Sequence, residues 1–332
     1  MSVTLKDVAD RAGVSRSAVS RTFTDGASVS ARMREKVERI ANEMGYQPNA
    51  LASGLTTGRT KLIGLISNNF HNPIFLQVFD LFTRGLQERG LRPLLVNLSN
   101  EIDPLKSVRM VQQYSVDGVI VASSTLSPDF ARAFKAAGIP VVHSFGRYTN
   151  TPKVHVVGID NIECGRMAAR ELISCGYRQV GFLGGPADAT STQDRFKGFR
   201  EELAAHPTIE LRHSFAPAYS FDAGRAEMLR LVAEGLAEAY FCGDDVLTIG
   251  ALSALQSAGK RVPDEIGLIG LNDMEMAGWE NINLTTIHQP IQKIVNASLE
   301  LVVSELHEPE PMPIAQLFTC HVVRRGTLPG RQ

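Results

Sequence analysis

Hydrophobic residues in the first 45 positions recur every three or four residues, which is the period of an amphipathic helix. Leu5, Val8, Ala9 and Ala12 share one such face. Thr4, Ser15 and Ser30 precede the periodic stretches as N-cap residues, and Gly13 and Gly45 follow them as stop signals. The second helix carries Val19 and Phe23, and the apolar stripe of the third consists of Met33, Val37, Ile40, Ala41 and Met44. The pattern therefore predicts three short helices.

Beyond Lys61 the pattern changes, and short apolar runs alternate with amphipathic stretches such as 73–89 and 165–175. This alternation is typical of βαβ units in a doubly wound α/β fold with parallel sheets, and 332 residues are enough for two such lobes behind the helical head. The run around Gly181–Pro186 lacks the spacing of a dinucleotide loop and should end a strand. The predicted strands are Leu62–Ser67, Pro93–Leu98, Gly118–Ser123, Pro140–Phe145, His155–Asp160, Val180–Gly184, Tyr240–Cys242, Ile266–Leu271 and Leu284–His288.

Charge is distributed unevenly along a chain whose net charge is only −1. Residues 1–60 hold nine Lys and Arg against six Asp and Glu, whereas the remainder holds 25 against 29. A basic head on an acidic body fits a head that meets phosphates. No apolar run is long enough for a membrane span, and the charged N-terminus does not resemble a signal peptide, so we expect a cytoplasmic protein without a membrane partner. The four scattered cysteines match no zinc spacing, and we expect them to be reduced, buried and unreactive.

The exposed face of the predicted second helix carries short hydroxyl donors and two cations but no acid. Arg16 and Arg21 are long enough to donate two hydrogen bonds to guanine in a major groove. Ser15 and Ser20 suit contacts with phosphate or sugar. A solvated helix face usually mixes the two signs of charge, so this composition favours DNA binding over a simple packing module.

A small, polar segment follows the third helix, from Gln47 to Thr60. Such a composition is typical of a flexible linker, but Pro48 could begin a helix, and Leu51 and Leu55 are four residues apart on it. One such turn is too short to be stable alone. We expect it to fold against DNA or against a second copy of itself.

Residues 4–55 resemble the head of the LacI/GalR (lac-repressor) family of transcription regulators. The resemblance implies that the second helix enters the major groove, with Arg16, Ser17 and Arg21 as base readers, and that a hinge helix lies in the minor groove. Tyr46 and Asn49 match the start of that hinge, and Leu55 matches a leucine that wedges a central base step. The complete predicted DNA-contacting set is Thr4, Ser15, Arg16, Ser17, Ser20, Arg21, Tyr46, Asn49, Ala52 and Leu55.

The resemblance covers the body too, where it implies two lobes joined by three crossings, as in periplasmic sugar-binding proteins. It divides the chain into a DNA-binding domain (1–47), a hinge (48–60) and a ligand-binding and dimerisation core (61–332). Within this core, the N-lobe takes about 61–160 and 290–318, and the C-lobe takes about 161–289 and 319–332. The chain ends without a leucine heptad, so we expect a dimer without an appended coiled coil that would join dimers into a tetramer.

Ligands of doubly wound sheets bind beyond the carboxyl ends of the strands, and those ends are polar and aromatic here. Such groups suit the hydroxyls and the C–H face of a sugar. In the family's pattern Arg195 contacts the ligand, Phe221 stacks on it and Asn272 senses its hydroxyls. Asn272 replaces the usual Asp, and Gly243-Asp244 replaces a common Asn-Asp, so a sugar acid or sugar phosphate is a further possibility beside a sugar. The predicted effector site comprises Asn69, Phe70, Phe75, Ser124, Asp160, Arg195, Phe221, Asp244 and Asn272.

Three other functions were weighed against this one. An enzyme lacks support, because the sequence shows no nucleophile elbow, no metal-spaced His/Cys cluster and no phosphate loop. A transport binding protein would need export, and a constitutive DNA architectural protein would need no pocket. We therefore expect a homodimeric repressor of a carbohydrate or related metabolite operon, without cofactor or metal. It would bind a near-palindromic operator under the control of a small sugar-like effector.

Overall fold

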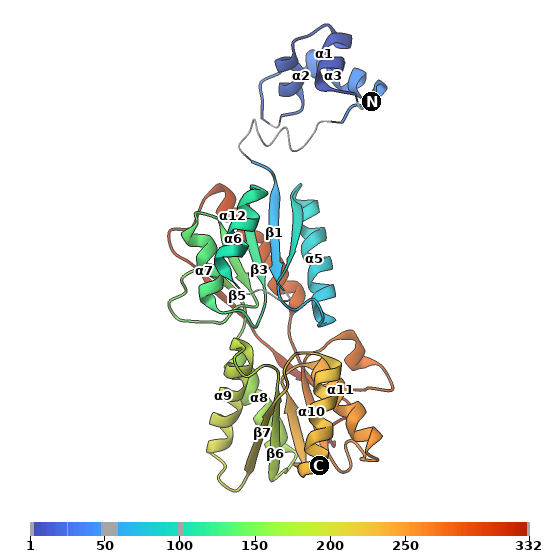
Figure 1. Cartoon of the computed structure of the whole chain (residues 1–332), viewed down its shortest axis with the longest axis vertical. Coiled ribbons are helices and arrows are strands. Elements are labelled where there is room, and N and C mark those ends of the chain that lie inside the picture. Colours follow the sequence, from blue (N-terminus) through green and yellow to red (C-terminus); the bar gives the residue numbers. More distant parts are fainter. Residues whose placement is uncertain (1–2, 25, 48–58, 99–102, 331–332) are drawn as a thin grey trace. The chain divides into compact units, whose positions relative to one another are not determined.

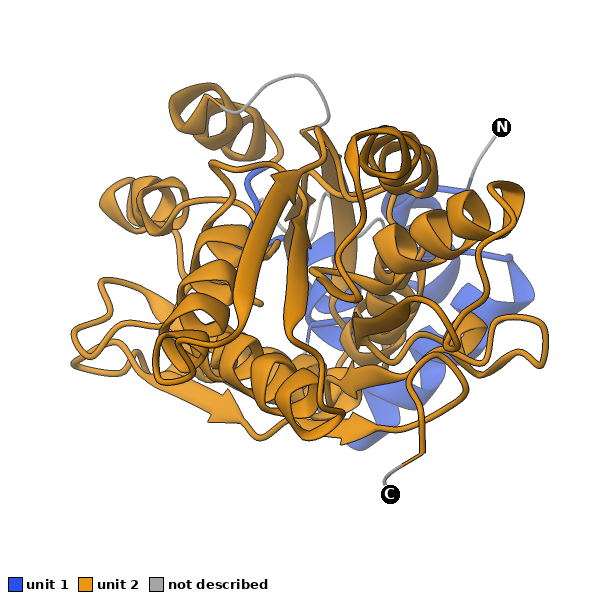
Figure 2. Ribbon diagram, turned by 90° about the horizontal axis from the view of Figure 1, so that it is seen from below, with its two compact units in different colours: residues 1–61, 115–117 blue, residues 62–114, 118–332 orange. Residues whose placement is uncertain are grey.

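The computed structural model describes residues 3–24, 26–47, 59–98 and 103–330. The chain separates into two compact units, one formed by residues 1–61 with 115–117 and the other by residues 62–114 with 118–332 (Figure 2). No helix among the described residues is long and apolar enough to span a membrane.

The first unit holds three helices, α1 (Leu5–Ala12), α2 (Arg16–Thr22) and α3 (Ala31–Glu43), as the sequence predicts. Each begins at an expected N-cap, because Thr4, Ser15 and Ser30 accept hydrogen bonds from the backbone of the first turn. Helix α1 ends at Gly13, whose φ of 63° is costly for residues with a Cβ. A small core closes the unit, formed by Val8, Ala9, Ala12, Val19, Val37, Ile40, Ala41 and Tyr46.

The second unit contains two six-stranded sheets, each built mostly from parallel strands (Figure 1). The N-lobe sheet has the order β11-β5-β4-β3-β1-β2, and the C-lobe sheet has the order β12-β10-β9-β8-β6-β7. Only the pair β10–β12 is antiparallel among the pairs of described residues. The predicted doubly wound α/β fold is therefore confirmed.

The N-lobe elements come mainly from the first half of the body. They are β1 (Leu62–Ser67), α5 (Ile74–Glu88), β2 (Arg92–Asn97), α6 (Pro104–Gln113), β3 (Gly118–Ala122), α7 (Pro128–Ala136), β4 (Val141–Ser144), β5 (His155–Ile159), α12 (Ile291–His307) and β11 (Ala315–Phe318).

The C-lobe elements occupy most of the remaining chain. They are α8 (Asn161–Ser174), β6 (Gln179–Gly184), α9 (Thr190–Ala204), β7 (Glu210–Phe215), α10 (Phe221–Glu234), β8 (Ala239–Cys242), α11 (Asp245–Ser257), β9 (Gly267–Asn272), η1 (Glu275–Gly278), β10 (Thr286–His288) and β12 (His321–Val323).

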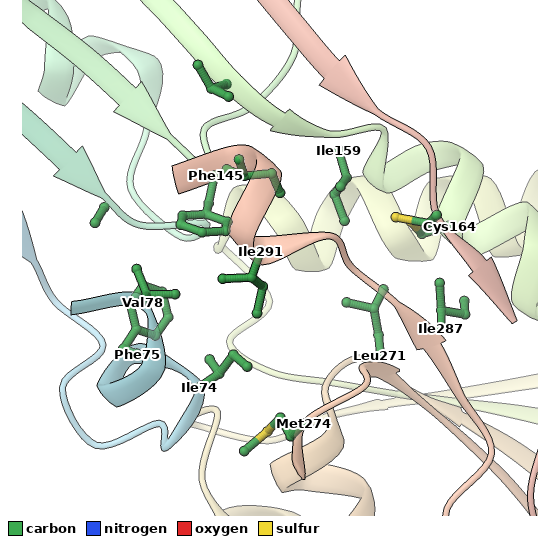
Figure 3. Close-up of a cluster of buried hydrophobic side chains, with 14 of the residues drawn as sticks. Ile74, Phe75, Val78, Phe145, Ile159, Cys164, Leu271, Met274, Ile287 and Ile291 are labelled. Atoms are coloured by element: carbon green, nitrogen blue, oxygen red, sulfur yellow. The ribbon is translucent and has the colours of Figure 1, made fainter. Parts of the chain in front are cut away.

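The chain crosses between the lobes three times, after β5, after β10 and after β11. Around these crossings one apolar cluster takes side chains from both lobes (Figure 3). Phe75 and Phe145 meet edge to face in it, with their ring centroids 6.2 Å apart, and Ile291 lies beside them. Leu271 and Ile287 of the C-lobe continue the same cluster. The crossings are therefore held by buried apolar contacts as well as by the backbone.

All nine predicted strands occur, although their ends move by one or two residues. Three further strands, β7, β11 and β12, lie outside the predicted set. They are the edge strands of their sheets, with the partly exposed patterns that edges show, and they carry few long apolar runs.

Candidate functional site

The predicted reader helix α2 presents polar side chains on an exposed face. Ser15, Arg16, Ser17 and Arg21 are exposed and Ser20 is half-buried, while Val19 and Thr22 face the core. The Ser15 hydroxyl accepts a hydrogen bond from the Ala18 amide at 3.2 Å, which orders the first turn. Arg16 and Arg21 thus stand on an ordered helix whose sequence contains no acid. The geometry leaves both guanidinium groups able to reach a nucleic-acid ligand.

The position of α2 is fixed from its inner side and from its C-terminal end. The Arg34 guanidinium donates a hydrogen bond to the Thr22 carbonyl oxygen at 2.5 Å and so ties α3 to the end of α2. Tyr46 lies in the core with 8% of its surface exposed and contacts the Phe23 ring, and burial raises the pKa of its hydroxyl. Thr4 forms a reciprocal capping box with Asp7. Tyr46 and Thr4 therefore have structural roles, and their contacts with DNA stay predictions.

Asn49, Ala52 and Leu55, which complete the predicted DNA-contacting set, lie outside the described residues.

In the body, most of the predicted effector residues gather around one cavity between the lobes. Six of the nine, Asn69, Phe75, Ser124, Arg195, Asp244 and Asn272, belong to its lining. The residues that the sequence did not single out are Asn72, Ile74, Val78, Phe145, Tyr219, Gln289 and Ile291. Polar groups thus converge from the strand ends of both lobes, and apolar side chains of α5 and α12, with Phe145 directly after β4, close one wall.

Asp244 is the centre of the buried polar network in this cavity. Its Oδ2 accepts hydrogen bonds from Asn72 Nδ2 at 2.9 Å and from Asn272 Nδ2 at 2.8 Å. Its Oδ1 accepts from the Val246 amide at 2.8 Å. Burial raises the pKa of the Asp244 carboxyl, and these hydrogen bonds act in the opposite direction. Because Asn72 belongs to the N-lobe and Asp244 to the C-lobe, this network connects the two lobes.

Arg195 lies beside this network and is 3% exposed. Its Nε donates to Asn161 Oδ1 at 2.8 Å, and its Nη1 donates to the Gly243 carbonyl oxygen. The close packing of α8 against α9 fixes this position, because a Cβ on Gly165 would lie 2.1 Å from the Arg195 carbonyl oxygen. The glycine is therefore required for the arginine to reach the cavity.

Asn272 occupies a backbone conformation that side chains rarely adopt, with φ of 128° at the end of β9. The next residue, Asp273, also has a positive φ of 58°. Asn and Asp tolerate such angles better than most residues, and strained backbone of this kind clusters at ligand sites. The turn presents the Asn272 amide to Asp244.

Tyr219 supplies the aromatic hydroxyl of the cavity. It is 8% exposed, and its hydroxyl lies 2.6 Å from Thr192 Oγ1. Phe221, the predicted stacking residue, is 38% exposed and does not belong to the described lining. Phe70 stacks on Phe79 at 4.6 Å between ring centroids, and Asp160 caps α8 by accepting a hydrogen bond from the Glu163 amide at 3.0 Å. The structure therefore leaves Phe221, Phe70 and Asp160 outside this cavity.

The lobes also meet through contacts outside this network. Thr190 Oγ1 and the Ser191 amide donate to the Ser124 carbonyl oxygen, at 3.0 and 3.2 Å. Arg147 pairs with Asp194 through both carboxylate oxygens. The cavity around Asp244 measures about 30 Å³, room for about two water molecules. A larger pocket of about 610 Å³ adjoins it and shares Asn69, Asn72 and Tyr219.

Comparisons with known proteins agree with this division into head and body. Residues 4–49 match the family of bacterial regulatory proteins of the lacI family, and residues 169–328 match a periplasmic binding protein-like domain. The transcriptional regulator CelR of Thermobifida fusca is 30% identical over 97% of both chains. The repressor PurR of Haemophilus influenzae is 29% identical over 91% of both chains.

Solved structures show the same architecture. A lac repressor dimer bound to operator and an anti-inducer matches with a TM-score of 0.87 over 98% of this chain and 99% of that chain, and its 24% identity supports the fold. A complex of CelR with cellobiose matches with a TM-score of 0.71 and 28% identity over 98% of this chain and 99% of that one. These relatives are regulators rather than enzymes, as the sequence predicts. The chain therefore belongs to the LacI family of bacterial regulatory proteins and is a DNA-binding regulator of transcription.

Proposed function

We propose that this protein is a cytoplasmic, homodimeric repressor that binds a near-palindromic operator and is controlled by a sugar, sugar acid or sugar phosphate between its lobes. The observation that carries the proposal is the pairing of two features in one chain. Helix α2 exposes Arg16 and Arg21 without an acid, and the body carries a cavity where polar groups from two lobes meet. The relatives bound to operator and to cellobiose support both halves.

A dimer follows from the small footprint of one head. A single α2 presents only a few side chains to base edges, so a specific site needs two heads, and two-fold symmetric proteins read near-palindromes. Residues 48–60 would join head to body as the hinge, with Leu55 as the wedge in the minor groove. Substituting Leu55 by Ala should weaken operator binding more than non-specific binding, and equal losses would exclude the wedge.

The effector would act by changing how the lobes close. The cavity of about 30 Å³ is far too small for a sugar ring, so a sugar that reaches Asp244 requires the contacts around this residue to rearrange. The residues proposed to contact the ligand are Asn69, Phe75, Ser124, Arg195, Asp244 and Asn272, together with Asn72 and Tyr219. Phe221 and Asp160 could join them only after such a rearrangement, and Phe70 only after leaving Phe79.

The experiment has two stages and uses the full chain. In the first, repeated selection from random duplexes identifies an operator, and a near-palindrome is the expected result. In the second, the affinity for that operator is measured with cellobiose, a hexose, a sugar acid and a sugar phosphate, each added separately. At least one should change the affinity, and the operator should change the affinity for that compound by the same factor. Selection that yields no preferred sequence would overturn the DNA half, and a constant affinity with every compound would overturn the effector half.

A further inference from the structure

Two of the four cysteines, far apart in the sequence, meet in the folded body. Cys164 lies near the start of α8, and Cys320 lies between β11 and β12. Strand β11 pairs with β5 as far as Phe318 and Ile159, so the segments that follow the two strands start side by side, and Cys164 and Cys320 line the same pocket. Both residues are buried, with 1% and 7% of their surface exposed. Their spacing in the sequence matches no known thiol motif, so only the folded structure shows that they are neighbours.

Each of these cysteines belongs to a crossing between the lobes. The chain leaves the N-lobe at the end of β5, passes Asp160 and enters α8, where Cys164 lies. It leaves the N-lobe again at the end of β11 and reaches β12 of the C-lobe through Cys320. A covalent bond between the two sulfur atoms would therefore tie two of the three crossings together.

The surroundings favour one of the two sulfur atoms as the reactive one. The neighbouring Cys164 thiol, followed by the positive charge of Arg195, lowers the pKa of the Cys320 thiol in spite of burial. The neighbouring Cys320 thiol and burial hold the pKa of the Cys164 thiol well above its usual value. Cys320 is also the more exposed of the two, at 7% against 1%. A thiolate is the reactive form of cysteine, so Cys320 is the nucleophile and Cys164 its neighbouring thiol.

A small reagent can approach this pair. Both cysteines line a surface pocket of about 250 Å³, together with Asp160, Glu163, Met167 and residues 317–319. The other two cysteines differ in ways that make them internal controls. Cys175 is more exposed, but burial and Glu171 raise the pKa of its thiol. Cys242 is fully buried, and burial raises the pKa of its thiol to about 12.

We propose that Cys164 and Cys320 form an oxidisable thiol pair that takes a hydroperoxide as its co-reactant and closes to a disulfide across the lobe crossings. The Cys320 thiolate attacks one oxygen of hydrogen peroxide, the O–O bond breaks, and Cys320 becomes a sulfenic acid that keeps the hydrogen of the attacked oxygen. The other oxygen leaves as hydroxide and becomes water with the proton that the Cys320 thiol had lost. The Cys164 thiol then loses its proton and attacks the Cys320 sulfur, the S–O bond breaks, and water leaves. Overall, two thiols and one peroxide give one disulfide and two waters.

The disulfide would restrain the hinge through which the lobes move. It joins the first turns of α8 to the connection between β11 and β12, so these crossings can no longer shift independently. Arg195 lines the cavity and donates to Asn161 Oδ1, one turn before Cys164 on α8, which places the oxidisable pair next to the proposed effector site. The oxidation itself does not depend on the proposed function of the protein.

The test follows all four cysteines in the full-length protein during treatment with hydrogen peroxide. Free thiols are alkylated at intervals, and peptides are mapped by mass spectrometry without reduction. The expected result is a cross-linked pair of peptides containing Cys164 and Cys320, two hydrogen atoms lighter than the separate peptides, while Cys175 stays free. Reaction of Cys175 first, with Cys164 and Cys320 both free, would mean that exposure alone governs reactivity and would overturn the proposal.

Variants separate the two steps of the reaction. Cys175→Ser is the matched control and should form the disulfide as the parent protein does. Cys164→Ser should stop at the sulfenic acid of Cys320, which dimedone traps, and Cys320→Ser should leave Cys164 unoxidised. Dimedone on Cys175 but not on Cys320 in Cys164→Ser would overturn the assignment of the nucleophile. The cross-link in the unsubstituted protein decides the proposal even if a variant fails to fold.

Discussion

Replacing Asn72 by Ala should loosen the closed arrangement of the two lobes. The Asn72 side chain is 4% exposed and donates to Asp244 Oδ2 at 2.9 Å across the cavity, while its Oδ1 accepts from the Ile74 amide at 3.2 Å. Alanine removes both bonds. The bond to the Asp244 carboxylate connects the lobes, whereas the bond to Ile74 only orders the start of α5 within the N-lobe. The first loss should therefore appear as opening of the lobes.

The size of this effect follows from the charge of the acceptor. A hydrogen bond to a charged group contributes about 1.5–3 kcal/mol, more than a neutral one. The parent protein has this bond in the closed state and loses it on opening. Removing the bond therefore lowers the free energy of opening by the whole of that amount. A difference of about 1.4 kcal/mol is tenfold, so the open fraction should rise by roughly 10- to 150-fold.

Hydrogen exchange at one backbone amide measures this opening directly. The Ser191 amide of the C-lobe donates to the Ser124 carbonyl oxygen of the N-lobe, and this bond breaks when the lobes separate. Its exchange should accelerate by the same factor in Asn72→Ala. The Ala216 amide, which bonds to Gly184 within the C-lobe, should keep its rate.

Asn68→Ala is the matched control for this prediction. Asn68 is also an asparagine near the end of β1, but its amide bonds to Thr125 and its carbonyl oxygen accepts from Ser123, both within the N-lobe. It should leave exchange at Ser191 unchanged. An unchanged rate in Asn72→Ala, or equal acceleration in both variants, would refute the idea that the bond to Asp244 holds the lobes together.

Three other predictions concern the head, the pH dependence and the packing. Arg21→Ala should weaken binding to duplex DNA and relax base preference by about 1–3 kcal/mol at one base pair. Arg39→Ala removes only an ion pair with Glu43 on α3 and should change neither the affinity nor the base preference. Binding titrations over a series of duplexes compare the two variants. Burial lowers the pKa of His143 from 6.5 to about 4, so between these pH values the unfolded chain binds a proton that the folded chain does not bind. The free energy of unfolding should therefore fall by about 3 kcal/mol as the pH drops through this interval. Urea unfolding at several pH values should show that His143→Gln lacks this loss. Gly165→Ala gains about 1 kcal/mol of helix propensity but forces a Cβ against the backbone of α9, at a cost of about 1–3 kcal/mol. Urea unfolding should therefore find it less stable than Gly85→Ala, whose new Cβ meets only side chains, those of Leu299 and Arg89.

The head was predictable almost to the residue because local rules decide its structure. Thr4, Ser15 and Ser30 cap helices in any context that lets a helix begin, and Gly13 adopts a positive φ that other residues avoid. The buried strands were equally visible as apolar runs. Strand β7 was not, because Glu210–Phe215 carries three charged or titratable side chains at the edge of its sheet. Pairing with β6 makes it a strand, and pairing is not a local property.

The site was predictable in part. Ligands of parallel sheets bind beyond the carboxyl ends of the strands, which identifies candidate positions in the sequence but not which side chains point into the cavity. It placed Asn69, Ser124 and Asn272 at the cavity. It could not distinguish Tyr219 from Phe221, which lie two residues apart around the start of α10, since only the packing against Thr192 decides which ring points inward. Asn72 was missed because its partner Asp244 is distant in the chain. The contact between Cys164 and Cys320 was hidden for the same reason.

The three crossings also determine how this protein can be divided. Helix α12 comes near the end of the chain, yet it packs against α5, β3, β4 and β5, which come much earlier. No single cut of the gene therefore releases an intact lobe, since a fragment ending before Ile291 would expose the apolar face that α12 covers. A rearranged gene could succeed where truncation fails, if it joined residues 62–159 directly to 291–318 and so kept every strand of one sheet in a single polypeptide.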